Sequence, residues 1–114
     1  MSECIFCRII EHKAPSHILY EDNRCIAFSD LNPQAPIHIL VVPKKHISTL
    51  LDFEKGDEEE IGHLFIVANR LAEEKKIQDA GFRTVINCKS AGGQMVYHVH
   101  LHLLGGRQMT WPPG

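Results

Sequence analysis

The sequence predicts an α+β domain in which about five short strands form a mostly antiparallel sheet, accompanied by one long and one short helix. Short segments rich in β-branched and aliphatic residues are separated by turn residues, and one longer segment repeats its apolar residues at helical spacing. The chain has 114 residues with neither an internal repeat nor a Gly/Ser-rich linker. This length predicts one domain over 1–114, with 109–114 as an extended, Pro-rich tail.

The first elements along the chain are short. Residues 4–11 carry Ile and Phe at helical spacing, and Pro15 ends this segment. A Glu-Asp-Asn turn separates the short segments 17–20 and 24–29, and this pattern predicts a β-hairpin.

The middle of the chain predicts a loop followed by a strand at the centre of the sheet. Residues 31–36 contain two prolines and are expected to be irregular. Residues 37–43 are rich in Ile, Leu and Val, which favours a central strand.

The longest predicted element is a helix that begins near Asp57. Asp57 and Glu60, three residues apart, resemble a capping box. The helix is expected to end in the charged run 73–76, with Gly81 beyond it. Its apolar stripe consists of Ile61, Leu64, Phe65, Ala68, Leu71 and Ala72.

The last third of the chain predicts two strands joined by a loop. Residues 82–88 and 96–104 are the strands, and 89–93 is the loop between them.

Composition excludes several classes of protein. Apolar residues make up 44% and charged residues 23%, which is typical of a globular domain and excludes global disorder. The longest apolar stretches, 39–42 and 64–68, are far shorter than the roughly 20 residues of a membrane span. A net charge of −2 argues against nucleic-acid binding. The N-terminus lacks the pattern of a signal peptide, so we expect a cytoplasmic protein with reduced thiols.

The unusual feature is eight histidines and four cysteines in so short a chain. Residues 98–103 alternate between imidazole and aliphatic side chains, so a strand would place His98, His100 and His102 on one face, roughly 6–7 Å apart. Such a row is wide enough to span a phosphoryl group and its leaving atom. The alternative is a half-buried strand with a His-rich polar face, although three protonated imidazoles in register would repel one another.

Glycines flank this predicted strand. Gly92 and Gly93 either form a simple turn or direct main-chain N–H groups toward an anion. Arg107, after the strand, is either a phosphate contact or a solvated loop residue.

Cys4 and Cys7 form a C-x2-C pair. Two thiolates at this spacing can hold one Zn²⁺ ion, which would need two further ligands. The alternatives are a thioredoxin-like redox pair, which lacks the preceding strand here, and two buried thiols. Cys25 and Cys88 lie in strand-like runs and are expected to be small core residues. The remaining histidines are expected to be solvated or incidental: His12, His17 and His63.

The segment from Gly92 to Gly106 resembles the signature of the histidine-triad (HIT) nucleotide-binding superfamily, most closely its Hint branch of nucleoside phosphoramidases. The resemblance covers nearly the whole chain in order, and its supporting segments are 5–10, 27–30, 33–38, 42–47 and 111–114. It implies a HIT-like fold, a zinc-bearing bacterial-type member, and a two-fold homodimer whose sheets join.

The resemblance implies a hydrolase of purine nucleoside phosphoramidates, such as adenosine 5′-phosphoramidate. His100 would attack the α-phosphorus and form a nucleotidyl-histidine intermediate, with its Nδ1–H held by a main-chain carbonyl. His102 would donate a hydrogen bond to a phosphoryl oxygen. His38 would lie beside the nucleophile, unless it is simply a satisfied core histidine. The proton donor to the leaving amine remains open between His98 and water.

The resemblance also implies a set of substrate-binding residues. Asp30 would accept hydrogen bonds from the ribose hydroxyls, unless it is only a turn aspartate. Met95 stands where many members have a serine, and its thioether cannot donate a hydrogen bond, so the preferred leaving group stays open. The phosphate side would be completed by Asn87, Gly93, Gln94 and His98. The apolar slot for the base would comprise Phe6, Ile9, Phe28 and Leu31, each of which could instead be core.

By the same resemblance, His46 and His98 join Cys4 and Cys7 as a closed Cys2His2 shell for one structural Zn²⁺ per chain. The triad alone does not distinguish a phosphoramidase from a dinucleoside polyphosphate hydrolase or a nucleotidyl transferase. A third alternative, from another class, is a zinc-stabilised nucleotide-binding interaction module without turnover. A purine nucleotide and a second copy of the chain are the expected partners, with neither nucleic acid nor membrane.

Overall fold

The computed structural model describes residues 3–114. Its helices are α1 (Ile5–Ile10), α2 (Glu58–Glu74) and α3 (Lys89–Gly92), with two 3-10 turns before α2, η1 (Leu50–Asp52) and η2 (Lys55–Asp57). Its strands are β1 (Ile18–Glu21), β2 (Cys25–Ser29), β3 (Ile37–Pro43), β4 (Phe82–Val85) and β5 (Leu101–Gly105). Among the described residues, no helix is both long and apolar enough to cross a membrane.

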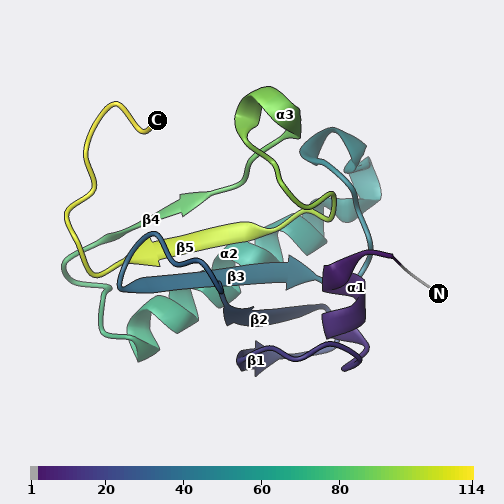
Figure 1. The fold of residues 1–114 in the computed structure, drawn as a ribbon, viewed down its shortest axis with the longest axis horizontal. Coiled ribbons are helices and arrows are strands. Elements are labelled where there is room, and N and C mark those ends of the chain that lie inside the picture. The colour runs from purple at the N-terminus through teal and green to yellow at the C-terminus, as the bar shows by residue number, and fades with distance from the viewer. Residues whose placement is uncertain (1–2) are drawn as a thin grey trace.

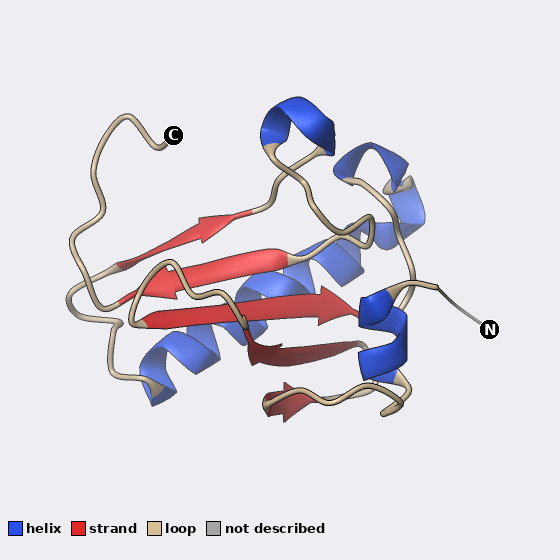
Figure 2. Ribbon diagram, in the orientation of Figure 1, coloured by secondary structure: helices blue, strands red, loops and turns tan. Residues whose placement is uncertain are grey.

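The five strands form one sheet in the order β1-β2-β3-β5-β4, with every neighbouring pair antiparallel (Figures 1 and 2). The predicted α+β class, the hairpin of β1 and β2 and the central position of β3 are confirmed. Residues 31–36 are irregular, as predicted.

The sheet separates two apolar layers, because strand side chains alternate between its faces. Helix α2 covers one face and lies behind the sheet in Figure 1, whereas α1 lies on the opposite face. The layer under α2 includes the strand residues Cys25, Ala27, Ile39, Val41, Leu101 and Leu103. The layer under α1 consists of Phe6, Ile9, Ile26, Phe28, Leu40 and Val42. The even-numbered positions of β3 and β5, including His38 and His102, therefore face away from α2.

Helix α2 packs with a face slightly different from the predicted one. Its buried residues are Leu64, Val67, Ala68, Leu71 and Ala72. Phe65 is 41% exposed and Ile61 only half-buried, so Val67 takes the place in the stripe that the sequence assigned to Phe65. The small and medium side chains at the buried positions let α2 approach a sheet surface that itself contains Ala27 and Val41.

The predicted capping box at the start of α2 is wrong. Asp57 is the N-cap residue, but its carboxylate makes no capping hydrogen bond with the helix. It accepts hydrogen bonds from the N–H of Glu54 and the ammonium group of Lys45 instead. The three glutamates in the first turn, residues 58–60, still place negative charge at the positive end of the helix dipole.

The C-terminal third differs most from the sequence prediction. Strand β4 ends at Val85, three residues earlier than expected, and the predicted loop 89–93 contains the short helix α3. Strand β5 begins only at Leu101, so residues 96–100 approach the sheet as irregular chain. Cys88 is consequently half-buried at the N-cap of α3 and not in the core, whereas Cys25 is fully buried as predicted.

The C-terminal end of β5 packs against the chain that follows α2. A Cβ atom at Gly105 would collide with the Cδ1 atom of Ile77, which is itself buried. The residues after β5 turn past β4, where the Arg83 guanidinium donates a hydrogen bond to the carbonyl of Thr110 (Figure 1).

Candidate active site and candidate metal centre

A cleft of about 460 Å³ lies on the face of the sheet opposite α2. Its lining includes these residues predicted for the site: His100, His102, His38, Asp30, Asn87, Gly93, Met95, Phe6, Ile9, Phe28 and Leu31. Phe6, Ile9 and Phe28 are buried, so one part of the cleft is an apolar slot. Leu31 and Met95 are 94% and 88% exposed and therefore lie at its rim.

The histidine row is more compact than the sequence suggests. Only His102 belongs to β5, because the strand begins one residue after His100. The ring centroids of His100 and His102 are 4.9 Å apart, which is shorter than the spacing expected along a regular strand. The main-chain N–H of Val99 bonds to the carbonyl of Ile47, which holds this irregular segment against the chain that follows β3.

His100 has one tautomer fixed by its surroundings. Its Nδ1 lies 2.8 Å from the carbonyl oxygen of His98, and a carbonyl oxygen can only accept. The proton therefore lies on Nδ1, and Nε2 carries the lone pair. Burial lowers the pKa of His100 below its ordinary value, although the bond to His98 opposes this. The ring is neutral near pH 7, which is the state that a nucleophile requires.

His102, His38 and Asp30 form a contiguous polar group beside His100. His38 Nε2 lies 2.9 Å from His102 Nδ1 and 3.4 Å from Asp30 Oδ2. Burial, together with the neighbouring His100 and His38, lowers the pKa of His102 to about 4, against the opposing charge of Asp30. Burial also lowers the pKa of His38, against the opposing charge of Asp30. The cleft thus presents neutral imidazoles with a single carboxylate behind them.

Asp30 follows β2 directly and fits both descriptions that the sequence allowed. Its Oδ1 accepts the main-chain N–H of Asn32 at 2.8 Å, which is a turn contact. Its side chain nevertheless lines the cleft and keeps 20% of its surface exposed. Each carboxylate oxygen has two lone pairs, so acceptor capacity remains for a ligand.

Two predicted substrate contacts lie outside the cleft lining. The Gln94 amide is buried: its oxygen accepts the N–H of Lys89, and its nitrogen donates to the carbonyls of Ser48 and Val96. His98 is fully buried, with Nε2 2.7 Å from the carbonyl of Pro43. Its ring therefore offers no proton to a group bound in the cleft.

The glycine pair forms a turn and not an anion nest. Gly93 has φ +87°, a left-handed conformation that glycine adopts without strain, and it ends α3. The N–H groups of Gly93 and Gln94 donate to the carbonyls of Ser90 and Lys89, so neither points toward a ligand. Arg107 is exposed and donates to the carbonyl of Gln34, which matches the loop alternative.

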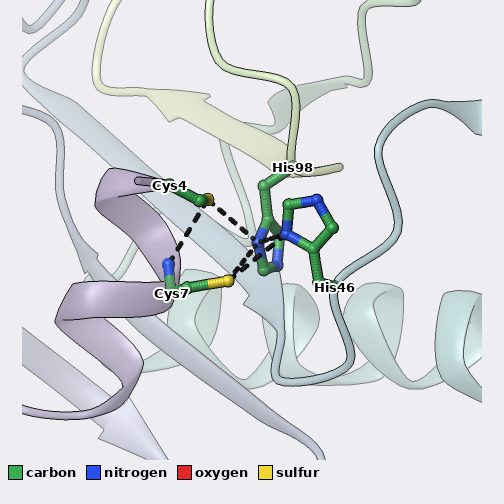
Figure 3. Close-up of side chains that lie close together, drawn as sticks. All are labelled: Cys4, Cys7, His46 and His98. Carbon is green, nitrogen blue, oxygen red and sulfur yellow. Dashed lines mark hydrogen bonds between the residues drawn. The ribbon is translucent and has the colours of Figure 1, made fainter. Parts of the chain in front are cut away.

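Cys4, Cys7, His46 and His98 converge next to the cleft, with their ligand atoms within 4.8 Å of one another (Figure 3). Helix α1 supplies both sulfurs, since Cys4 is its N-cap residue and Cys7 lies in its first turn. His46 follows β3, and His98 precedes β5. The predicted quartet is thus brought together from three parts of the chain.

The geometry of this quartet fits a tetrahedral ion. Three sulfur–nitrogen distances, from Cys4 to His98 and from Cys7 to His46 and His98, are 3.3–3.5 Å, and the Nδ1 atoms of the two histidines are 3.1 Å apart. Zinc–ligand bonds of about 2.3 Å to sulfur and about 2.0–2.1 Å to nitrogen give tetrahedral edges of about 3.6 and about 3.3 Å. The donor set agrees as well. His98 Nε2 must donate to the Pro43 carbonyl, so Nδ1 presents its lone pair to the two sulfurs, an arrangement that a cation would stabilise.

Sequence reasoning missed a polar cluster on the opposite side of the sheet. His63 of α2 lies 2.6 Å from Asp22 Oδ2, so His63 joins α2 to the β1–β2 hairpin and is not incidental. The same carboxylate accepts from the Tyr20 hydroxyl and the N–H groups of Arg24 and Cys25. The two partners are 41 residues apart, and no local motif indicates the contact. His12 contacts Glu21, and His17 contacts Ser29, both at exposed positions.

Comparison with known proteins identifies the family. The HIT domain model matches residues 11–109. A 14 kDa zinc-binding protein of Zea mays is 48% identical over 115 residues, covering 99% of this chain and 89% of that protein.

Solved structures agree with this assignment. A HIT family hydrolase from Legionella pneumophila has a TM-score of 0.97 and 49% identity, covering 98% of this chain and all of that one. A histidine triad nucleotide-binding protein from Candida albicans has a TM-score of 0.82 and 29% identity, covering 96% of this chain and 83% of that one. On these matches, together with the geometry of its histidines, the chain belongs to the HIT domain family.

Proposed function

We propose that this protein hydrolyses purine nucleoside phosphoramidates, including adenosine 5′-phosphoramidate and compounds of the aminoacyl-AMP type. The observation that carries the proposal is the neutral His100 ring, whose Nε2 lone pair is left available by the hydrogen bond to the His98 carbonyl. The hydrolase of Legionella pneumophila and the nucleotide-binding protein of Candida albicans support hydrolysis of a nucleotide in a cleft of this kind.

The reaction would proceed in two displacements at phosphorus. His100 Nε2 forms a bond to the α-phosphorus, the phosphorus–nitrogen bond breaks, and the amine departs after taking up one proton. Water then attacks the nucleotidyl-histidine, loses a proton, and releases the nucleoside monophosphate with His100 neutral again. His102 would donate a hydrogen bond to a phosphoryl oxygen in both transition states, and His38 would hold His102 in place.

The remainder of the cleft suits a nucleotide. We assign the base to the apolar slot of Phe6, Ile9 and Phe28, and the ribose hydroxyls to Asp30. Asn87 and Gly93 would lie on the phosphate side. Gln94 makes three internal hydrogen bonds, so its role would be to hold the α3 loop and not to contact substrate. Met95 and Leu31, at the rim, would contact the leaving group or exclude water, without donating a hydrogen bond.

We also propose one structural Zn²⁺ per chain, held by Cys4, Cys7, His46 and His98. The zinc-binding protein of Zea mays and the tetrahedral distances of the quartet support this. Four protein ligands leave no open position, so the ion would cross-link α1 to the segment before β5 and would supply no Lewis acid at phosphorus.

A homodimer in the cytoplasm completes the proposal. Strand β4 is one of the two edge strands of the sheet, and pairing of its outer edge with a second copy by two-fold symmetry would cover that edge. Size-exclusion chromatography with light scattering measures this directly, and a monomeric mass would contradict the dimer.

The experiment that tests the function compares hydrolysis of adenosine 5′-phosphoramidate with hydrolysis of diadenosine polyphosphate by the zinc-loaded protein. We expect faster turnover of the phosphoramidate, and ³¹P detection of a phosphorus–nitrogen bond on His100 after acid quench. His100→Ala should abolish hydrolysis while AMP binding survives. Faster cleavage of the polyphosphate, or unchanged turnover in His100→Ala, would contradict the proposal.

A further inference from the structure

The loop before β3 places a main-chain amide against the histidine that supports His102. The N–H of Gln34 donates to His38 Nδ1 at 3.0 Å. Two other contacts fix this stretch of loop: the Gln34 carbonyl accepts from Arg107 Nε at 3.0 Å, and the Gln34 side chain donates to the carbonyl of Asn32 at 3.0 Å. The amide is thus held in position from both sides, and it can only donate.

This contact determines which nitrogen of His38 carries the proton. Nδ1 receives the hydrogen of the Gln34 amide, so it must present a lone pair, and the proton of the neutral ring lies on Nε2. From Nε2 that proton faces two acceptors, His102 Nδ1 at 2.9 Å and Asp30 Oδ2 at 3.4 Å. His102 Nδ1 is therefore an acceptor too, and the His102 proton lies on Nε2.

The other protonation states bring two hydrogens face to face. A proton on His102 Nδ1 would oppose the Nε2–H of His38, and a proton on His38 Nδ1 would oppose the amide of Gln34. An imidazolium at either ring requires one of these collisions. The surroundings of His102 also favour the neutral ring: burial and the neighbouring His100 and His38 lower its pKa, and only Asp30 raises it.

We propose that the main-chain amide of Gln34 is a positioning group that locks the tautomer of His38 and, through it, keeps His102 a neutral ring with its proton on Nε2. This proposal rests on the proposed function for its consequence in catalysis. His102 then donates a hydrogen bond to phosphoryl oxygen without acting as the acid, because loss of its Nε2 proton would leave an imidazolate. The proton that the departing amine takes up comes from water, since His98 lies outside the cleft lining.

The test is ¹⁵N NMR of protein labelled in its histidine rings, in the zinc-loaded wild type and in a matched pair of variants. Gln34→Pro removes the N–H and the side chain, whereas Gln34→Ala removes only the side chain. In wild type and Gln34→Ala we expect a pyridine-like Nδ1 and a pyrrole-like Nε2 for His102 from about pH 6 to about pH 8. In Gln34→Pro a second tautomer should appear, and kcat should fall several-fold relative to Gln34→Ala with little change in KM.

A His102 ring that is charged near pH 7 in the wild type, or protonated on Nδ1, would overturn the proposal. The same conclusion would follow if Gln34→Pro matched Gln34→Ala in both spectrum and kcat. If Gln34→Pro does not fold, the α-hydroxy analogue of glutamine at this position replaces the amide by an ester and removes the same N–H. Wild-type protein that shows the expected tautomers without phosphoramidase activity would refute the proposed function and leave the tautomer lock intact.

Discussion

Replacing Phe6 tests the idea that helix α1 both stabilises the fold and holds the nucleophile. The Phe6 ring is 6% exposed, and it lies edge-on to His100 with centroids 5.0 Å apart, to Phe28 at 5.5 Å and to His98 at 6.0 Å. Phe→Ala substitutions in protein cores cost about 3–5 kcal/mol. Because this ring borders a cleft that water can enter, we expect Phe6→Ala to lower the free energy of unfolding by about 3 kcal/mol.

Phe6→Leu separates packing from the ring contact. Leucine retains most of the apolar volume, so Phe6→Leu should lower the free energy of unfolding by about 1 to 1.5 kcal/mol. It loses the edge-on contact with His100, which is worth about 0.5–1.5 kcal/mol for an aromatic pair. If that contact orients His100 for attack, kcat for the phosphoramidate should fall about two- to twelve-fold.

Urea denaturation followed by circular dichroism, with zinc in excess, measures the free energy of unfolding, and steady-state kinetics measures kcat. Leu71→Ala is the control, because Leu71 belongs to α2 and is fully buried against the other face of the sheet. We expect it to cost about 2–5 kcal/mol and leave kcat unchanged. A cost below about 1 kcal/mol for Phe6→Ala, or an equal fall of kcat in Leu71→Ala and Phe6→Leu, would refute the reasoning.

Three further predictions concern other contacts. Asp22→Asn should lower the free energy of unfolding at pH 7, because the hydrogen bonds of Asp22 hold its pKa well below the ordinary value although burial raises it. The loss of unfolding free energy should shrink as the pH falls below about 4, and urea titrations at pH 7 and below about pH 4 check this. Gly105→Ala should cost about 1–3 kcal/mol through its collision with Ile77, and Ile77→Val, which removes the colliding Cδ1 atom, should restore part of it in a double-mutant cycle. Cys7→Ser should reduce zinc content measured by elemental analysis well below one ion per chain and lower Tm, and an unchanged zinc content would contradict the proposed ligand set.

The parts of the fold that follow from side-chain periodicity could be predicted from the sequence. Alternation along β3 places Ile39 and Val41 under α2, and it places His38 on the opposite face with the cleft. The helical repeat of α2 was predicted, but its exact facing was not. Phe65 and Val67 are both apolar, and only the shape of the opposing sheet surface decides which of them is buried.

The features that could not be predicted depend on main-chain groups or on distant partners. Residues 96–100 have the composition of a strand, yet they run as irregular chain, with Val99 bonded to Ile47 and His98 to the carbonyl of Pro43. The hydrogen bond from the Gln34 amide to His38 involves a main-chain group, so side-chain patterns in the sequence do not predict it, although it decides the tautomer of His38. His63 and Asp22 meet only because α2 packs over the hairpin.

Helix α1 has six residues, well short of the about 12–15 that an isolated helix needs to persist in water. It therefore exists only while it is docked, through the burial of Phe6 and Ile9 and through the cysteines at its start. Three of its residues, Ile5, Phe6 and Ile9, line the cleft. If the proposed zinc ion holds α1 in place, a chelating buffer or an oxidant would act on substrate affinity without touching any histidine of the cleft, and a KM measured for this protein would depend on the metal content of the preparation.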